Sequence, residues 1–221
     1  MGIHRYDVYR SPNIGIFLKA NDNFLFIPKG FADSKAEKLE SFLKVKCVRA
    51  SIAYSRLLGP LAVMNNKGML VPRITEDYEV QELRRATDMN VERAQLKITA
   101  LGNLIVANDK AALASPIIPK EALRQMQDVL GVPVEQMNID GYHQVGALVV
   151  STNQGAAVHP KTSEHEIDRI KENLQVDVEA ATVNGGVPFV TSGVVANSKS
   201  IVVGTLTTGP ELIMLSRAFK I

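Results

Sequence analysis

The stretch Ala100-Leu101-Gly102-Asn103-Leu104-Ile105-Val106-Ala107-Asn108-Asp109 decides the fold that this chain is predicted to adopt. It contains a glycine, then a short apolar run rich in β-branched residues, and then an asparagine where a turn is expected. This pattern is typical of one strand that enters a tight hairpin. The same pattern recurs along the chain, so it is the unit from which the rest of the sequence is interpreted.

Two ladders of residues indicate that the pattern occurs five times. Asparagines close the expected first strand at intervals of 44, 43, 45 and 44 residues, at Asn21, Asn65, Asn108, Asn153 and Asn197. Prolines follow at a constant interval of 44 residues, at Pro28, Pro72, Pro116 and Pro160, and the next position in that ladder is Gly204. Proline has no N–H group and cannot continue a strand ladder, so it ends the second strand. Two ladders with one period predict a fivefold repeat.

Each repeat is predicted to contain a strand, a turn, a second strand, a helix and a third strand. The glycines that open the first strands are expected to let neighbouring backbones approach closely around a narrow axis; they are Gly15, Gly59, Gly102, Gly146 and Gly193. Capping boxes predict where helices begin, because a Ser or Thr and a Glu three residues later satisfy each other's backbone N–H groups. The predicted boxes are Ser34 with Glu37, Ser163 with Glu166 and Thr208 with Glu211.

The two ends of the chain predict a closed ring. The repeats span approximately residues 14–56, 57–99, 100–143, 144–190 and 191–221, and the last one lacks a third strand. Residues 4–10 form an expected strand that belongs to no repeat, and this strand can complete the fifth one. Closure removes exposed strand edges, which otherwise invite aggregation. We therefore predict an α/β fold, a closed five-bladed α/β propeller with pseudo-fivefold symmetry, in a single domain over residues 1–221.

Composition predicts a soluble intracellular protein. The 221 residues are 46% hydrophobic and 22% charged, which is ordinary for a globular domain. The one cysteine, Cys47, excludes an internal disulfide framework and fits a reducing compartment. No apolar run reaches the roughly 20 residues that span a bilayer, and the N-terminus has no apolar core of a signal peptide. We expect a cytoplasmic protein that does not enter membranes.

The net charge of +2 hides a difference between the two halves of the chain. Residues 1–110 carry 17 Lys and Arg against 12 Asp and Glu, and residues 111–221 carry 8 against 11. This asymmetry of +5 against −3 permits a positive face for a polyanion. The alternative is a scatter of solvated charges, which is favoured because the chain has no dense basic run.

No familiar catalytic or metal-binding motif occurs in the sequence, and no cofactor or metal is expected. His159 and His165 are six residues apart across a proline, which is no common metal spacing, so structural or surface roles are favoured for both. Fivefold α/β rings include enzymes that modify guanidine groups with a cysteine, which makes Cys47 the alternative site. Its neighbours Val45 and Val48 favour a packed structural thiol instead.

The residues that follow the ladder glycines vary, although a pure scaffold would keep them alike. They are Ile16, Pro60, Asn103, Ala147 and Val194. Asn103 is polar and precedes an apolar strand, so it is expected to face the open end of the ring. It is therefore a candidate contact for a partner.

Several motifs in a fixed order carry a resemblance to a known family. They are the five repeats, Ala50-Ser51-Ile52 with Arg56 to Gly59, Ala100-Leu101-Gly102-Asn103, His159-Pro160-Lys161-Thr162-Ser163 and Thr207-Thr208-Gly209-Pro210-Glu211-Leu212. Together they resemble the translation initiation factor 6 family of archaea and eukaryotes, over the whole chain. The chain is most similar to the archaeal form, because it ends soon after the expected fifth helix. The fold implied by the resemblance is pentein-like.

The resemblance implies a monomeric, non-enzymatic factor that binds the large ribosomal subunit and sterically prevents the small subunit from joining. It also implies a role in late maturation of the large subunit, contact with a ribosomal protein, and a position near the sarcin–ricin loop of the rRNA. The implied ribosome-binding residues are Arg56, Gly59, Pro60 and Asn103. Pro60 stands where eukaryotic members can carry a basic residue, so one charged contact is in doubt. A guanidine-modifying enzyme that uses Cys47 is the alternative.

Overall fold

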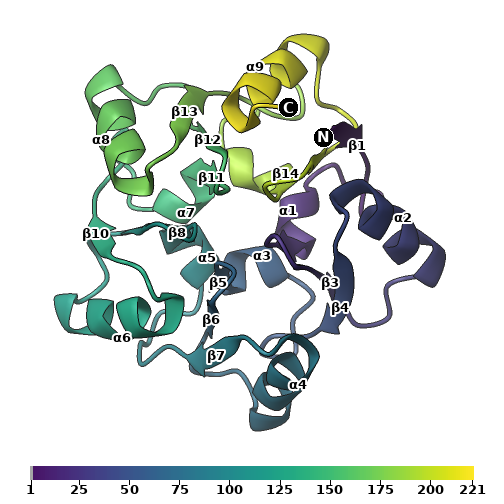
Figure 1. Cartoon of the computed structure of the whole chain (residues 1–221), viewed down its shortest axis with the longest axis vertical. Coiled ribbons are helices and arrows are strands. Elements are labelled where there is room, and N and C mark those ends of the chain that lie inside the picture. The colour runs from purple at the N-terminus through teal and green to yellow at the C-terminus, as the bar shows by residue number, and fades with distance from the viewer. Residues whose placement is uncertain (1) are drawn as a thin grey trace.

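The computed structural model describes residues 2–221, which form five similar units around a common centre (Figure 1). Each of the first four units contains a short helix, two strands, a long outer helix and a third strand. In unit one these are α1 (Ile14–Phe17), β2 (Lys19–Ala20), β3 (Phe24–Pro28), α2 (Asp33–Leu43) and β4 (Lys46–Ala50). In unit two they are α3 (Leu58–Leu61), β5 (Val63–Met64), β6 (Gly68–Val71), α4 (Asp77–Thr87) and β7 (Asn90–Arg93).

The remaining units repeat this order. Unit three comprises α5 (Leu101–Leu104), β8 (Ile105–Ala107), β9 (Ala112–Ala114), α6 (Lys120–Leu130) and β10 (Val134–Gln136). Unit four comprises α7 (Val145–Leu148), β11 (Val149–Ser151), β12 (Gly155–Val158), α8 (Glu164–Leu174) and β13 (Asp177–Ala180). Unit five comprises the 3-10 helix η1 (Val190–Ser192), β14 (Val194–Ala196), β15 (Ile201–Val203) and α9 (Gly209–Phe219).

The N-terminal strand β1 (Ile3–Arg5) completes the sheet of unit five. In the sheet of every unit the first pair of strands is antiparallel and the second pair is parallel. β1 takes the place of the third strand, because it pairs in parallel with β15 from Ile3 beside Ile201 to Arg5 beside Val203. The predicted pairing is thus confirmed, although the strand is shorter than the expected residues 4–10.

The sequence predicted that each glycine-led segment is a strand along its whole length, and this prediction was wrong. Each begins with a helical turn of three or four residues, and the strand starts only after it; in the opening stretch the turn is α5 and the strand is β8. The turns contact one another in a circle, from α1 through α3, α5 and α7 to η1 and back to α1. The physical reason is close packing, because a helical turn presents the bare Cα of its glycine to the backbone of the preceding unit.

The distances explain why glycine occupies these positions. A Cβ atom on Gly59 would lie 1.8 Å from the carbonyl oxygen of Gly15, and one on Gly102 would lie 1.9 Å from that of Gly59. In unit five the position belongs to Thr191, whose hydroxyl donates to the carbonyl of Gly146 at 2.8 Å. The prediction that Gly193 continues the glycine ladder was therefore wrong.

The asparagine ladder caps the hairpin turns at the other end of the units. The side-chain oxygen of Asn65 accepts hydrogen bonds from the backbone N–H groups of Lys67 and Gly68, at 2.9 and 3.0 Å. Asn21, Asn108 and Asn197 make the same pair of bonds. In unit four the hydroxyl of Thr152 takes this role, so the assignment of Asn153 to the ladder was wrong by one residue.

The residues that follow the turn caps form a closed cycle of hydrogen bonds, which we name the turn ring. In it, each backbone N–H donates to the side chain of the next unit, at 2.6 to 3.3 Å. The members are Asp22, Asn66, Asp109, Asn153 and Ser198, and the N–H of Ser198 donates to Asp22. Asn153 therefore has a structural role in this ring, as acceptor from Asp109 and donor to Ser198, although it is not a turn cap.

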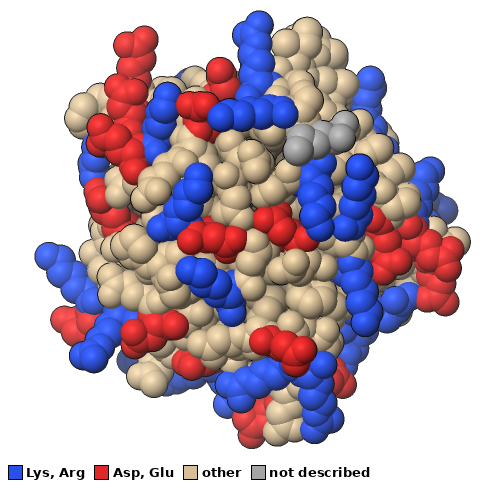
Figure 2. Space-filling view, viewed as in Figure 1, with Lys and Arg blue, Asp and Glu red and all other residues tan. Residues whose placement is uncertain are grey.

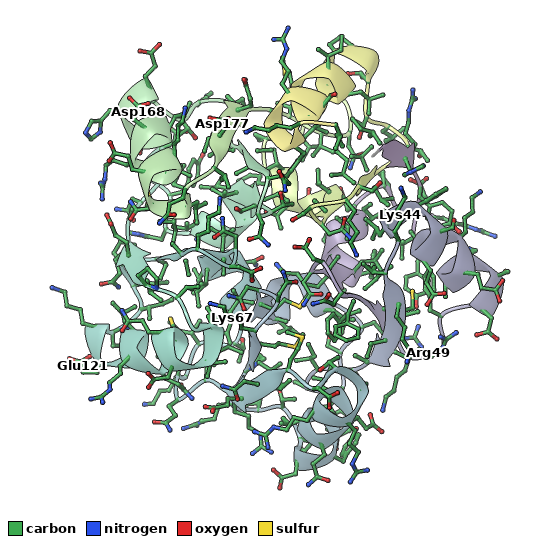
Figure 3. All side chains as sticks on the ribbon, viewed as in Figure 1. Lys44, Arg49, Lys67, Glu121, Asp168 and Asp177 are labelled. Atoms are coloured by element: carbon green, nitrogen blue, oxygen red, sulfur yellow. The ribbon has the colours of Figure 1, made fainter. Side chains whose placement is uncertain are left out.

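Five apolar clusters fill the spaces between sheets and helices. Helix α2, for example, buries Ala36, Leu39 and Leu43. The capping boxes predicted for α8 and α9 are confirmed, but the box at Ser34 is wrong because α2 begins two residues earlier, with Ala32 and not Ser34 as its N-cap. A charged pair also joins two units: Asp177 of β13, labelled in Figure 3, binds Lys220 at the end of α9 in unit five at 2.8 Å, in addition to Lys171 of its own unit at 3.0 Å.

Candidate docking face

The strand directions give the molecule two distinct ends. The five helical turns, and the loops that lead into them and into the long helices, lie where the parallel strands end; we name this end the short-helix face. The capped hairpin turns and the turn ring lie at the opposite end, which we name the turn face. This separation decides which side chains lie together on one surface.

Exposed large apolar side chains gather on the short-helix face. Of the eleven such residues among residues 2–221, nine lie in its loops or at the first turn of a long helix: Tyr9, Tyr54, Leu57, Ile74, Tyr78, Ile117, Tyr142, Phe189 and Leu206. The other two lie on α9. Scattered apolar residues are normal on a protein surface, whereas a contiguous exposed group of them marks an interaction site.

The implied contact residues Arg56, Gly59, Pro60 and Asn103 all lie on this face. Arg56 is exposed in the loop before α3, while Asn103 is half-buried on α5, which packs directly against α3. No hydrogen bond or ion pair of the Arg56 or Asn103 side chain occurs within residues 2–221, so both are available to a ligand. Gly59 is buried against the Gly15 backbone, which gives it a packing role, and its part in ribosome binding stays a prediction.

A buried carboxylate holds the loop that carries Tyr54 and Arg56. Ala53 and Tyr54 both have left-handed backbones, with φ of 52° and 58°, which non-glycine residues rarely adopt. The carboxylate of Glu79 accepts their N–H groups at 2.9 and 3.0 Å, and it also accepts the N–H of Glu76 at 3.0 Å in the capping box of α4. Burial raises the pKa of Glu79, but these hydrogen bonds outweigh it and the pKa is lowered. The loop is therefore held rigidly.

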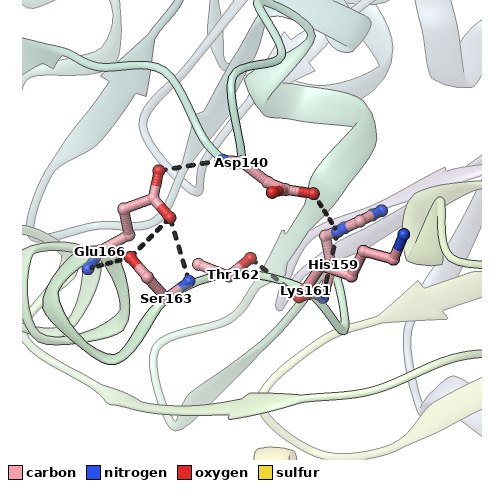
Figure 4. A network of polar contacts seen from close by, with 6 residues as sticks. All are labelled: Asp140, His159, Lys161, Thr162, Ser163 and Glu166. Carbon is pink, nitrogen blue, oxygen red and sulfur yellow. Dashed lines mark hydrogen bonds and ion pairs between the residues drawn. The ribbon is translucent and has the colours of Figure 1, made fainter.

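Units four and five use the same device. Glu166 accepts the N–H of Asp140 at 2.9 Å and caps α8 through Ser163 (Figure 4). Glu211 accepts the N–H groups of Gly185 and Gly186, at 3.1 and 2.8 Å. Five loops of the short-helix face lead into the helical turns. Three of them are thus fixed by a glutamate from the outer helix of the unit that they enter.

An aromatic cluster continues the face between units four and five. The Tyr142 and Phe189 rings lie 6.0 Å apart between centroids, and both pack on His159. His159 is buried, its Nδ1 lies 3.5 Å from Asp140, and it accepts the N–H of Lys161 at 3.3 Å (Figure 4). Burial lowers the pKa of His159, so a neutral ring is favoured at neutral pH. The structural role predicted for this histidine agrees with its packing.

Unpaired cations flank the apolar residues of the short-helix face. Five exposed ones from units one to four form no ion pair within the described residues: Arg10, Arg56, Arg73, Lys97 and Lys161. No dense basic patch results, and the view in Figure 2 shows positive and negative residues interspersed. The face therefore combines apolar contacts with separate positive charges, a composition that suits a surface of protein and RNA together.

Cys47 lies away from this face, on the outer strand β4. Its backbone N–H donates to Glu40 at 2.6 Å, and its sulfur packs among the apolar residues beneath α2. Burial raises the pKa of the thiol to about 12, with a further contribution from Glu40. A nucleophilic cysteine requires a lowered pKa and an adjacent base, and this thiol has the opposite environment.

The described residues also bear on metal binding and on membrane insertion. Within residues 2–221, no three His, Cys, Asp or Glu residues are grouped in a way that suits a metal ion. The same part of the chain has no helix with the length and apolarity that a membrane crossing requires.

The sequence did not predict the exposed apolar residues of the short-helix face. Tyr54, Ile74 and Leu206 are far apart in the chain, and Ile74 and Leu206 each stand alone among polar neighbours. A signal existed in the register, since Ile74 and Leu206 each follow the proline ladder by two residues. Their joint exposure on one face depends on the assembly of the units, which no local pattern reports.

Comparison with known proteins decides the family. The sequence profile described as the eIF-6 family matches residues 3–218. The chain is 47% identical over 219 residues to translation initiation factor 6 of Cenarchaeum symbiosum, covering 99% of both chains. The chain belongs to the eIF-6 family.

Other relatives agree with membership in the eIF-6 family. Identity to translation initiation factor 6 of Nitrosopumilus maritimus is 46% over 219 residues, covering 99% of both chains. Identity to that of Thermococcus onnurineus is 40% over 223 residues, covering 99% of this chain and 98% of the relative. Among solved structures, DDAH from Pseudomonas aeruginosa complexed with citrulline is 11% identical, with a TM-score of 0.47 and coverage of 75% of this chain and 68% of that one.

Proposed function

We propose that this eIF-6 family member docks through its short-helix face on the large ribosomal subunit and sterically prevents the small subunit from joining. The observation that carries the proposal is the concentration of nine exposed apolar side chains on that single face, beside unpaired cations. The relatives are named translation initiation factor 6, which supports a role in translation. A role in late subunit maturation and a position near the sarcin–ricin loop, in the cytoplasm, belong to the same proposal.

The short-helix face has its shape before a partner binds. Glu79, Glu166 and Glu211 fix three loops of the face, so little conformational freedom is lost when a partner binds. Tyr54 and Tyr78, with ring centroids 6.1 Å apart, supply the aromatic anchors that dominate binding energy in many interfaces. Arg56 can contact a phosphate or carboxylate with two parallel hydrogen bonds.

The proposal includes a closed five-bladed propeller of one domain, acting as a monomer. The pairing of β1 with β15, the circle of helical turns and the turn ring all support closure. A closed ring keeps the five loops of the docking face at constant spacing. Its rigidity is the reason that a small protein can present a face broad enough to obstruct a subunit.

The protein acts by binding rather than by catalysis in this proposal. The alternative, a guanidine-modifying enzyme using Cys47, is disfavoured by the raised thiol pKa and by the packing of the half-buried Cys47 against the apolar residues beneath α2. Turnover of arginine or agmatine that disappears in Cys47→Ser would establish that alternative.

Co-sedimentation with purified large subunits tests the docking face. Arg56→Glu reverses one exposed charge and Asn103→Ala truncates one side chain, and each is expected to weaken binding roughly tenfold, since interface anchors contribute on the order of 1–2 kcal/mol. Arg85→Glu, an equal charge reversal at an exposed position on α4 away from the face, is the matched control. All three should melt within a few degrees of the wild type. Equal binding by Arg56→Glu, Asn103→Ala and the control would place the interface elsewhere.

A further inference from the structure

A cavity runs along the centre of the five units. It has a volume of about 70 Å³ and receives lining residues from every unit, from Gly15 and Thr191 near the short-helix face to Asp22 and Asn66 of the turn ring. A single water molecule requires roughly 10–15 Å³, so the cavity has room for several waters or for a small ion with its hydration. The cavity walls therefore offer a second binding surface, which is separate from the docking residues of the short-helix face.

One position in the cavity wall breaks the fivefold symmetry. The residue two places before each turn cap faces the cavity in every unit; four units supply Val63, Val106, Val150 and Val195, and unit one supplies Lys19. Lysine is strongly hydrated and a valine at this position suffices for packing in four units. Lys19 is thus the one charged residue among the five at this position, and the other four are valines.

The ammonium group of Lys19 has no partner within residues 2–221, where it forms neither a hydrogen bond nor an ion pair. Lys19 is half-buried, and its desolvation lowers its pKa to about 8, with no neighbouring carboxylate to counter this effect. An ammonium ion that is withdrawn from water is stabilised either by losing its proton or by gaining an anion. The protein itself does not supply that anion.

The other charged residues that line the cavity are already satisfied. Asp22 and Asp109 lie in the turn ring, where the side-chain amides of Asn66 and Asn153 donate to both carboxylates at 2.5 to 2.9 Å. Ser198 adds two further bonds to Asp22, and the pKa of Asp22 is lowered: burial raises it, but these bonds outweigh burial. The carboxylates close one end of the cavity and leave Lys19 as its free charge.

We propose that the axial cavity is a binding site for a small anion, a halide or a small oxyanion, held by Lys19 between the valine walls. The valines exclude water from the far side of the anion and strengthen its attraction to the ammonium group. The site is independent of ribosome docking, because it lies inside the ring and uses none of the docking residues.

A titration in solution tests the site with bromide as the probe. The pKa of Lys19 is followed by the ¹³Cε resonance of lysine in the full chain, at constant ionic strength, with bromide replaced stepwise by a bulky sulfonate that does not fit the cavity. Linkage predicts that bromide at tenfold its Kd raises the pKa by about one unit, because the anion binds only the charged amine. An identical pKa in bromide and in the sulfonate would overturn the proposal.

Crystals soaked in sodium bromide locate the ion by its anomalous scattering. We expect a peak inside the cavity beside the Lys19 ammonium in the wild type and none in Lys19→Met, which keeps the length of the side chain without its charge. Lys35→Met, at an exposed position of α2, is the control and should retain the peak. Lys19→Met is expected to fold, because it removes a half-buried charge that has no partner. A peak that persists in Lys19→Met, or an empty cavity in the wild type, would refute the role of Lys19.

Discussion

Replacement of Gly59 by alanine tests whether close packing of the helical turns holds the units together. The new Cβ would stand 1.8 Å from the carbonyl oxygen of Gly15, whereas real Cβ atoms essentially never come within 3.0 Å of another heavy atom. The two helical turns must therefore separate by about 1.2 Å, the difference between these distances. The atom in the way belongs to the backbone, so no side-chain rotation relieves the contact.

The expected loss of stability is at least about 3 kcal/mol, the upper part of the range for overpacked cores. Alanine also restricts the unfolded chain, but this gain of roughly 0.4–1 kcal/mol is smaller. For a chain of this size each kcal/mol lowers the Tm by roughly 2–4 °C, so Gly59→Ala should lower it by roughly 6–12 °C.

Differential scanning calorimetry and thermal circular dichroism measure this change. Ser34→Thr adds one methyl group at an exposed position on α2, and it should change stability by less than about 0.5 kcal/mol. A Tm for Gly59→Ala that matches this control would show that the turns tolerate separation, and the packing argument would fail.

Three further predictions concern the buried acids and the thiol. Glu211 has a pKa of about 2, because its hydrogen bonds outweigh burial; against the ordinary 4.5, this contributes up to about 3 kcal/mol of stability above pH 4.5 that is lost as the pH falls towards 2. Denaturant titrations from pH 7 to 3 should show a shallower loss of stability in Glu211→Gln than in the wild type, because the other carboxylates with lowered pKa values still contribute. Glu79→Ala removes the acceptor of the Ala53 and Tyr54 amides, and we expect a loss of about 2–3 kcal/mol together with weaker docking on large subunits; unchanged stability would contradict the role of this carboxylate. Cys47 should react with Ellman's reagent at pH 7.5 roughly a thousandfold more slowly in the folded than in the unfolded chain, because its pKa is about 12; rapid labelling of the folded protein would count against this.

The long-range order of the fold could be predicted from the sequence because it is written as a repeat. The interval of 44 residues between Asn21 and Asn65 reports the length of one unit, and the unmatched strand at the N-terminus indicates where the fifth unit is completed. The helical turns could not be predicted, since a segment of four residues such as Leu101–Leu104 has no helical period. Thr152 and Asn153 show the other limit: both side chains can cap a turn, and only the register of the strands separates their roles.

The docking residues were predictable only in part. Arg56, in the loop before α3, and Asn103, on the neighbouring α5, lie on the same face, in agreement with the expectation that they act together, and their part in ribosome binding stays a prediction. The surrounding apolar side chains, such as Tyr54 and Phe189, become a surface only when five loops from distant parts of the chain meet. Gly59 contributes through packing between units, a contact that depends on the Gly15 backbone 44 residues away.

Subunit re-association measures the central claim most directly. Purified large and small subunits are mixed at moderate magnesium with increasing amounts of the full chain, and the products are separated on a sucrose gradient. The proposal predicts that the protein travels with the large subunit and that whole ribosomes decrease as it saturates, while Arg56→Glu requires a higher concentration for the same effect. An undiminished peak of whole ribosomes at saturating wild-type protein would contradict the account.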